Sequence, residues 1–379
     1  MAGYIFLFND IKALHKAVES GVYSTIFNTE PNINRGWLTQ HEGTFADYST
    51  MKEGDDVYFF IERKIYGIGK MINVGPDCKY FNFVGADIPK SFLSKDIQNS
   101  LLWSDLREKY ARQRMICTFK PAPQFFKEGV DMDDVLTSDP AAFKVIRALW
   151  KLSFIKMDDI ESQALRNSIL KFNESELNEA GKSFHYDNRA HEEIKNKITN
   201  LHQFSVDTFL NSCADGHVLK HEMAIELGLL YGLSRKELDV FGAWDYISHQ
   251  VIASPFKPID YMDKMDIFGY RYITNHTPTI SKYLVIEVKK SIAKQDDLVQ
   301  LMKYVDWIRG EYCHGDYSMI SSYLVASDFD DGVLENKELL ARRQYVIGTK
   351  PPKSKLWTEL RLVKYKYLSE KLNFDLVNP

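Results

Sequence analysis

Apolar and polar residues alternate in short runs over roughly the first third of the chain. The runs at 4–8, 55–62 and 65–71 are rich in aromatic and aliphatic residues and are bounded by turn residues, a pattern that predicts β-strands. A helix is expected at 10–21, after the first of these runs. Short strands separated by turns predict a compact β-barrel, which we assign to a first domain of residues 1–135.

A helical pattern replaces the short runs at 136–212. Asp139 and Pro140 are residue types that favour the N-cap and the first turn of a helix. The apolar residues that follow recur at helical spacing: Phe143, Ile146, Leu149 and Trp150. Further helices are expected after Asp159 and after Asp187. The pattern predicts a helical connector that acts as a spacer or an oligomerisation arm.

The pattern changes again in the last domain, residues 213–379. The segment 283–288 is mostly apolar and predicts a buried strand. The next segment has apolar residues at helical spacing: Leu298, Leu301, Met302, Val305 and Ile308. Gln300 and Tyr304 lie on another side of this predicted helix, where they can orient a water molecule or hold a phosphate.

Polar residues at the end of the buried strand suggest a chemical role. Side chains two positions apart on a strand point to the same face, so Glu287 and Lys289 leave the sheet together while Ile286 and Val288 face the core. Asp266, at the start of the preceding strand, can meet Glu287 across a hairpin. Two carboxylates with open water positions suit Mg²⁺, and the backbone carbonyl of Val288 offers another ligand. An ammonium group beside them can polarise the attacking water and offset phosphate charge.

This order of residues resembles the PD-(D/E)xK nuclease superfamily. The Q-x-x-x-Y helix that runs into YVDWI is most similar to the Mrr-like and NucS-type branches, which are DNA endonucleases. The resemblance covers 213–379 and implies a restriction-endonuclease-like α/β domain, a mixed sheet flanked by helices, that uses Mg²⁺ or Mn²⁺. It implies that Asp266 and Glu287 bind the metal, that Lys289 is the catalytic lysine, and that Gln300 and Tyr304 are accessory helix residues.

The superfamily usually has one more acid on an upstream helix. The predicted helix at 219–233 offers Glu222 and Glu226, one turn apart. We favour Glu222, because the apolar residues then form a packed stripe: Leu219, Met223, Leu227 and Leu230. The sequence departs from the short proline–aspartate form of the motif, since Pro258 is far from Asp266. Asp260 and Asp263 compete with Asp266 for the ligand role, and Asp266 is preferred because a strand begins directly after it.

The first domain carries a second resemblance. Trp37, the segment MKEGDDVYFFIERKIYGIGKM and the later RMICTFKPAPQFF resemble the PUA-like superfamily, in particular EVE and YTH-like domains. These modules bind RNA or DNA, and several hold a flipped modified base in an aromatic pocket. The resemblance implies a base-binding pocket, for which the candidates are Trp37, Tyr48, Tyr58 and Trp103, because aromatic faces stack on an extruded base. The alternative is that these aromatic residues belong to the core of the barrel.

Composition sets limits on partners and compartment. The chain of 379 residues has a net charge of −4, so binding to DNA requires its basic residues to be concentrated in a groove or a specific reading module. The four cysteines lie far apart in the sequence, which argues against a zinc site and a disulfide framework. No apolar run approaches the ~18 residues of a membrane helix and no cleavage signature opens the chain, so a cytoplasmic protein with no membrane partner is expected.

Together these patterns predict a metal-dependent DNA endonuclease. Its first domain is expected to recognise a feature of the DNA, such as a modified base, in restriction or antiphage defence. A homodimer is expected, because two sites cut two strands. Two alternatives stay open. An RNA-directed nuclease would discriminate through the 2′-hydroxyl, and a binding protein on a nuclease scaffold would bind nucleic acid with Mg²⁺ and leave it intact.

Overall fold

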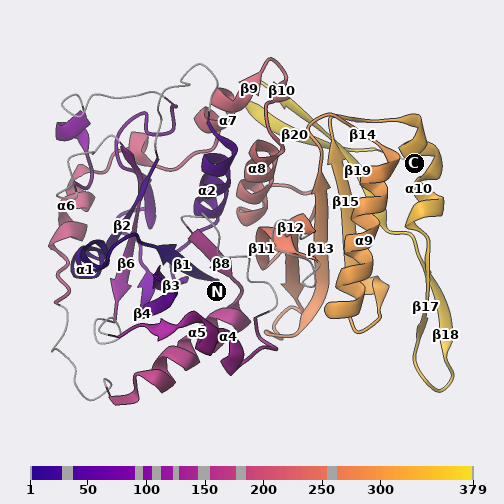
Figure 1. Cartoon of the computed structure of the whole chain (residues 1–379). Helices are drawn as coiled ribbons and strands as arrows, with labels where there is room; N and C mark the ends of the chain where they lie inside the picture. Colours follow the sequence, from indigo (N-terminus) through magenta and orange to yellow (C-terminus); the bar gives the residue numbers. More distant parts are fainter. Residues whose placement is uncertain are drawn as a thin grey trace. The chain divides into compact units, whose positions relative to one another are not determined.

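The computed structural model divides into two compact units, Met1–Ser212 and Cys213–Pro379 (Figure 1). The residues that it describes are 2–27, 37–89, 97–104, 112–122, 128–143, 154–175, 185–253 and 263–377. Among them, no helix combines the length and the apolar character needed to cross a membrane.

The N-terminal unit combines one large sheet with short helices. Its elements are β1 (Gly3–Leu7), α1 (Ile11–Ser20), β2 (Val22–Ile26), α2 (Thr39–Ser49), β3 (Asp56–Ile61), β4 (Lys64–Met71), β5 (Lys79–Phe81), β6 (Gln113–Pro121), β7 (Val130–Asp131), α4 (Met132–Ser138), β8 (Phe154–Met157), α5 (Asp159–Phe172), α6 (Arg189–Lys197) and α7 (Asp207–Cys213). The strand order is β2-β6-β4-β3-β1-β8, with β5 beside β6 and β7 beside β4. Only the β1–β3 pair is parallel among these described strands.

The predicted strands at 55–62 and 65–71 and the predicted helix at 10–21 are confirmed. The helix α1 begins at Asp10, whose side chain accepts a hydrogen bond from the backbone of Ala13 at 2.8 Å, and it ends at Gly21 with a φ of 65°. Both are common ways to satisfy the backbone groups at helix ends. The end strands β2 and β8 do not pair with each other in the described part of the chain. The described pairings therefore do not confirm the closed barrel that the sequence predicts.

The structure differs from the prediction of a separate helical connector at 136–212. Strand β8 pairs antiparallel with β1, and α5 packs onto this sheet. Ile155 and Leu165 lie in the same buried cluster as Ile5 and Tyr58. The segment is therefore part of the core of the N-terminal unit. The helical repeat predicted at Ile146, Leu149 and Trp150 lies outside the described residues.

The C-terminal unit is a mixed α/β fold. Its elements are β9 (Ala214–Asp215), β10 (Val218–Leu219), α8 (Glu222–Ser234), β11 (Tyr246–Ile252), β12 (Lys264–Tyr272), β13 (Ile280–Val288), β14 (Ile292–Ala293), α9 (Gln295–Glu311), β15 (Ile320–Ala326), β16 (Asp328–Phe329), α10 (Asp331–Ala341), β17 (Arg343–Ile347), β18 (Lys353–Trp357), β19 (Leu360–Leu368) and β20 (Lys371–Leu376). The main sheet has the order β11-β12-β13-β15-β19-β20. Strands β13, β15 and β19 run parallel, and the other pairs are antiparallel.

Two helices pack on this sheet. The helix α9 packs on β13 and β15, and α8 packs on β11 (Figure 1). The backbone of Lys294 donates to Asp297 at 2.8 Å in a capping box that starts α9. The predicted stripe from Leu298 to Ile308 is buried, which confirms this helix and the face that it packs.

Candidate functional site

A row of polar side chains crosses three strands of the C-terminal sheet. The pairs His249↔Ile267 and Val251↔Met265 set Gln250 of β11 opposite Asp266 of β12. The pair Ile267↔Ile286 sets Asp266 beside Glu287 of β13 on the next rung. Residues opposite each other in antiparallel strands share a face of the sheet. The register therefore brings Gln250, Asp266 and Glu287 together.

Gln250 links this row to the helix α8. Its Nε2 atom lies 3.2 Å from Oδ1 of Asp266 and 3.2 Å from both carboxylate oxygens of Glu226. Gln250 has a φ of 54° inside a strand, a left-handed conformation that costs a residue other than glycine about 1 kcal/mol or more. His249 is also close, with Nδ1 at 3.5 Å from Oε2 of Glu226. Neither Gln250 nor His249 is recognisable from the sequence, because both depend on strand register.

Lys289 is held by the strand that precedes it. Its Nζ atom lies 2.7 Å from Oε1 of Glu287 and 3.9 Å from Oδ1 of Asp297. Glu287 is only 1% exposed. The second oxygen of Glu287, Oε2, is buried and receives no hydrogen bond from a donor group of the described residues. One acceptor in this cluster is therefore open to a ligand.

The surroundings of the cluster disfavour the charged forms of Asp266 and Glu287. Burial, and then the neighbouring carboxylates Glu226 and Glu287, raise the pKa of Asp266 well above its usual range. Burial raises the pKa of Glu287 to about 7, although Lys289 opposes this shift. Burial lowers the pKa of Lys289, but the charges of Glu287 and Asp266 outweigh it and raise that pKa overall. A bound cation would relieve the repulsion between these acids.

The residues fit a magnesium ion with few side-chain ligands. Asp266 Oδ2 accepts a hydrogen bond from the backbone N–H of Val288 at 2.7 Å. The N–H and C=O of one strand residue point to the same side, so the carbonyl of Val288 also faces Asp266. In the ranges that the structure describes, no three His, Cys, Asp or Glu side chains gather around one point as metal ligands. Two carboxylates, a carbonyl and water suit Mg²⁺, which keeps several waters when bound.

The accessory residues of α9 lie beside the acids. Gln300 Nε2 donates to the hydroxyl of Tyr304 at 2.8 Å. Tyr304 is 2% exposed, and burial together with the charges of Glu287 and Asp266 raises its pKa. The phenol is therefore a neutral hydrogen-bonding group. The ring of Tyr304 is buried, so its predicted role in holding a phosphate or a water molecule falls to its hydroxyl and to Gln300.

The structure favours Glu226 over Glu222 as the acid on the upstream helix. Glu226 is 2% exposed and shares Gln250 with Asp266. Glu222 is partly exposed and instead accepts a hydrogen bond from the backbone of Lys290 at 3.3 Å. The preference for Glu222 relies on one apolar stripe, but α8 is buried on nearly every side: Ala224, Ile225, Glu226, Leu227, Leu229, Leu230, Gly232 and Leu233. Asp260 and Pro258 lie outside the described residues.

Three of the four aromatic residues predicted for a base pocket belong to the core of the N-terminal unit. Trp37, Tyr48 and Tyr58 are at most 2% exposed. Trp37 stacks on Phe209 with ring centroids 5.7 Å apart, and its Nε1 donates to the carbonyl of Asp87 at 3.0 Å. The prediction is wrong for these three residues, because none of them presents a ring face to solvent.

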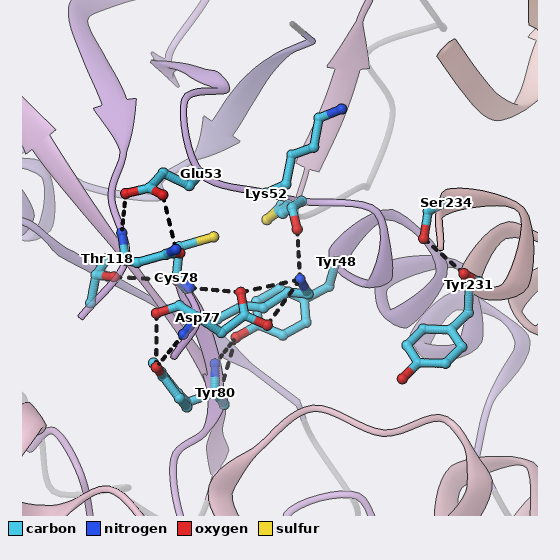
Figure 2. A network of polar contacts seen from close by, with 12 residues as sticks. Tyr48, Lys52, Glu53, Asp77, Cys78, Tyr80, Thr118, Tyr231 and Ser234 are labelled. Carbon is cyan, nitrogen blue, oxygen red and sulfur yellow. Dashed lines mark hydrogen bonds and ion pairs between the residues drawn. The ribbon is translucent and has the colours of Figure 1, made fainter. Parts of the chain in front are cut away.

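The hydroxyl groups of the two tyrosines are already occupied inside the unit. The hydroxyl of Tyr58 donates to the carbonyl of Ser162 at 2.9 Å. The hydroxyl of Tyr48 accepts from the backbone N–H of Tyr80 at 2.7 Å, and Figure 2 shows both residues in one polar network that includes Asp77. These contacts stabilise the core and leave no group for a ligand.

Trp103 lies at a cavity instead. This cavity has a volume of about 860 Å³ and is lined by the end of β1, by α1, by β2 and by the start of α6. Trp103 is partly exposed there, and Tyr23, Asn9, Ser24 and Gln113 also contribute to the wall. The sequence does not distinguish Tyr23 from the core aromatics, because it sits in an ordinary alternating strand.

Comparisons with known proteins add little. No family model and no curated protein matches the chain. Among solved structures, a repair endonuclease from Pyrococcus abyssi is 22% identical over 34% of this chain, with a TM-score of 0.22. The matched part of this chain spans 46% of that endonuclease. The YTH domain of the Zygosaccharomyces rouxii MRB1 protein, in complex with N6-methyladenosine RNA, is 10% identical over 44% of this chain and 86% of its own, with a TM-score of 0.23. At these scores neither likeness supports an argument about fold or function.

Proposed function

We propose that the C-terminal unit is a Mg²⁺-dependent nuclease that hydrolyses phosphodiester bonds in DNA. The observation that carries this proposal is the cluster of Glu226, Asp266 and Glu287, with Lys289 2.7 Å from one of its acids. A buried cluster of three acids with one ammonium and one amide lowers the stability of a fold. Its presence in this chain therefore favours a functional role. Cleavage of a polyanion with a divalent cation is a task that needs these groups together.

The residues of the chain have distinct roles in this proposal. Asp266, Glu287 and the carbonyl of Val288 would hold the Mg²⁺, which when bound polarises a phosphoryl oxygen and lowers the pKa of water. Lys289, fixed by Glu287, orients the attacking water and offsets charge on the phosphate. Glu226 holds Asp266 in position through the amide of Gln250. Gln300, held by Tyr304, supplies a further polar group beside the acids.

We propose that the N-terminal unit recognises the DNA through its cavity. A volume of about 860 Å³ lies within the range of ligand sites, which is about 300 to 1,000 Å³. Trp103 can stack on an extruded base, and Asn9, Ser24 and Gln113 can read its polar edge. A nuclease directed by a modified base suits restriction or antiphage defence, and a homodimer would let two sites cut two strands.

The first test is cleavage of matched plasmids that are unmodified, methylated or hydroxymethylated. We expect cleavage to require Mg²⁺ and to differ among the plasmids. Lys289→Ala should reduce the rate by about 10³-fold, which is about 4 kcal/mol of transition-state stabilisation. The matched control is Lys282→Ala on β13, the strand that precedes Lys289. The ammonium of Lys282 lies 3.9 Å from the exposed Glu359, and this variant should retain the wild-type rate.

Each other outcome changes a different part of the proposal. Equal rates for Lys289→Ala and the wild type would remove the active-site assignment. Equal cleavage of all plasmids would keep the nuclease and discard recognition of a modification. Cleavage of RNA alone would replace DNA as the substrate, and Mg²⁺-dependent binding without cleavage of either polymer would indicate a binding protein.

A further inference from the structure

The strands β17 and β18 form a ribbon that stands apart from the main sheet of the C-terminal unit. They pair with each other, from Arg343↔Trp357 to Ile347↔Lys353, and with no other described strand. In Figure 1 they are the two yellow strands that extend beyond α9 and α10. A lone two-stranded ribbon is marginally stable in water. Its root must therefore hold it in place.

The root of the ribbon is fixed to the body of the unit. Arg343 makes a bidentate ion pair with Asp306 of α9, with Nε–Oδ1 at 2.8 Å and Nη2–Oδ2 at 3.0 Å. The hydroxyl of Tyr317 donates to the same carboxylate at 2.8 Å. Tyr345 and Trp357 pack on Tyr317, with ring centroids 5.6 and 5.9 Å away. The two strands thus leave the body at a defined place.

The outer part of the ribbon is exposed and basic. Val346 is 63% and Leu356 51% exposed. The segment 342–358 contains no acidic residue, although the chain as a whole has a net charge of −4, and it carries five basic ones: Arg342, Arg343, Lys350, Lys353 and Lys355. The three lysines are exposed. None of them forms an ion pair with a residue that the structure describes.

The shape and charge of the ribbon suit a nucleic-acid duplex. Five residues per strand give a length of ~17 Å, and paired strands are ~5 Å apart. The major groove of B-DNA is ~12 Å wide and admits a two-stranded ribbon. Lys353 and Lys355 are two positions apart and leave the same face of β18. Unpaired like charges repel each other in the free protein, and phosphates on both sides of a groove would neutralise them.

We propose that the β17–β18 ribbon is an arm that enters a groove of double-stranded DNA and contacts its phosphates through Lys350, Lys353 and Lys355. The inference rests on the proposed function, because the duplex that the arm holds is the one that the unit cleaves. It adds a surface outside the acid cluster, and it explains how a chain with a net negative charge can bind a polyanion.

The test is the salt dependence of binding to a labelled duplex by the full chain, in EDTA so that cleavage does not interfere. The arm variant is Lys350→Gln/Lys353→Gln/Lys355→Gln. Each lost phosphate contact should reduce the slope of log K against log salt by about 0.9, so the slope should fall by about 2 to 3. Affinity at about 0.1 M salt should fall at least tenfold. The matched control, Lys236→Gln/Lys366→Gln/Lys371→Gln, changes the same charge at exposed positions and should bind like the wild type.

Several results would overturn the proposal that the arm binds duplex DNA. These are an unchanged slope in the arm variant, an equal loss in the control, equal losses for single-stranded and double-stranded DNA, or no binding of the duplex by the wild type at low salt. Circular dichroism and the melting temperature show whether the arm variant is folded, and Lys350→Gln/Lys353→Gln provides a milder change. If the wild type binds duplex through the arm but cleaves nothing with Mg²⁺, the arm stands and the proposed nuclease fails.

Discussion

The two units bury acidic side chains in opposite surroundings. In the N-terminal unit, Asp56 is 7% exposed and has partners of the opposite charge. Lys70 Nζ lies 3.0 Å from its Oδ1, the guanidinium of Arg166 contacts the same oxygen, and Ser162 Oγ donates to Oδ2 at 3.0 Å. In the C-terminal unit, Glu226, Asp266 and Glu287 lie in one cluster with the amide of Gln250, the imidazole of His249 and the ammonium of Lys289.

The difference separates a structural charge from a functional one. A buried acid with cationic partners links distant parts of the chain and holds them together, as Asp56 links β3 with β4 and α5. A cluster of like charges lowers stability, and natural proteins keep such clusters at functional sites. Four tests can break or sharpen this comparison.

The largest effect is expected from the acids of α8. Glu226→Gln should reduce Mg²⁺-dependent cleavage about 100-fold, or about 2.7 kcal/mol. The neutral side chain would hold the amide of Gln250, and through it Asp266, less firmly than the carboxylate does. Glu222→Gln, one turn away on the same helix, should change the rate less than about threefold, since a partly exposed acid contributes little. Single-turnover rates compare the two variants. Equal losses in both would contradict the assignment of Glu226.

Stability should respond in opposite directions to the same chemical change in the two units. Asp56→Asn should lower the free energy of unfolding by about 2 kcal/mol, because it leaves Lys70 and Arg166 without their acid, and both are partly exposed, which moderates the loss. Asp266→Asn should raise it by about 1 kcal/mol, because it removes a buried carboxyl whose charged form is disfavoured by burial and by two neighbouring acids. Urea denaturation in EDTA measures both. A loss of stability in Asp266→Asn would show that this acid is structural.

A further contrast between the units is a difference in pH dependence. Burial, and then the charge of Arg114, lower the pKa of His41 to about 4, whereas burial raises the pKa of Glu287 to about 7. An unfolded His titrates near 6.5 and an unfolded Glu near 4.3. Between pH 6.5 and 4 the unfolded chain therefore gains a proton at His41 that the folded chain does not, so acid destabilises the fold. Between pH 4.3 and 7 the folded chain keeps a proton at Glu287 that the unfolded chain releases, so this stabilisation is lost as the pH rises.

The two pH effects are measured by comparing each variant with the wild type in EDTA. From about pH 5 to pH 8, the wild type should gain about 2 kcal/mol relative to His41→Gln and lose about 2.5 kcal/mol relative to Glu287→Gln. Unfolding curves at both pH values give these differences. The same sign for both variants would contradict the contrast between the units.

The sequence predicts part of the candidate site, because the apolar patterns of two of its elements are continuous. The apolar run of β13 and the stripe of α9 identify both elements, and a hairpin brings Asp266 to Glu287. Glu226 is not predictable, because α8 is apolar on nearly every side. Its pattern therefore does not show whether Glu222 or Glu226 faces the site. Gln250 depends on strand register and on a positive φ, which no local pattern indicates.

The N-terminal unit shows other limits of sequence patterns. Strand β8 has only four residues, Phe154–Met157, too few for periodicity to separate a strand from a helix. Its role in the sheet depends on the distant partner β1. Aromatic residues in alternating strands face either a core or a cavity, so Tyr58 and Trp103 look alike in sequence and differ in burial.

The central claim is that the like-charged acids of the C-terminal unit form a site for a divalent cation. The most direct test is the melting temperature of the full chain with and without Mg²⁺ at about pH 8, above the pKa of about 7 of Glu287. Mg²⁺ at about 100 times its dissociation constant should add about 2.7 kcal/mol and raise the wild-type melting temperature by roughly 5 to 10 °C. Asp266→Asn should start higher and shift little. A wild type that Mg²⁺ leaves unchanged, or an equal shift in both proteins, would contradict the claim.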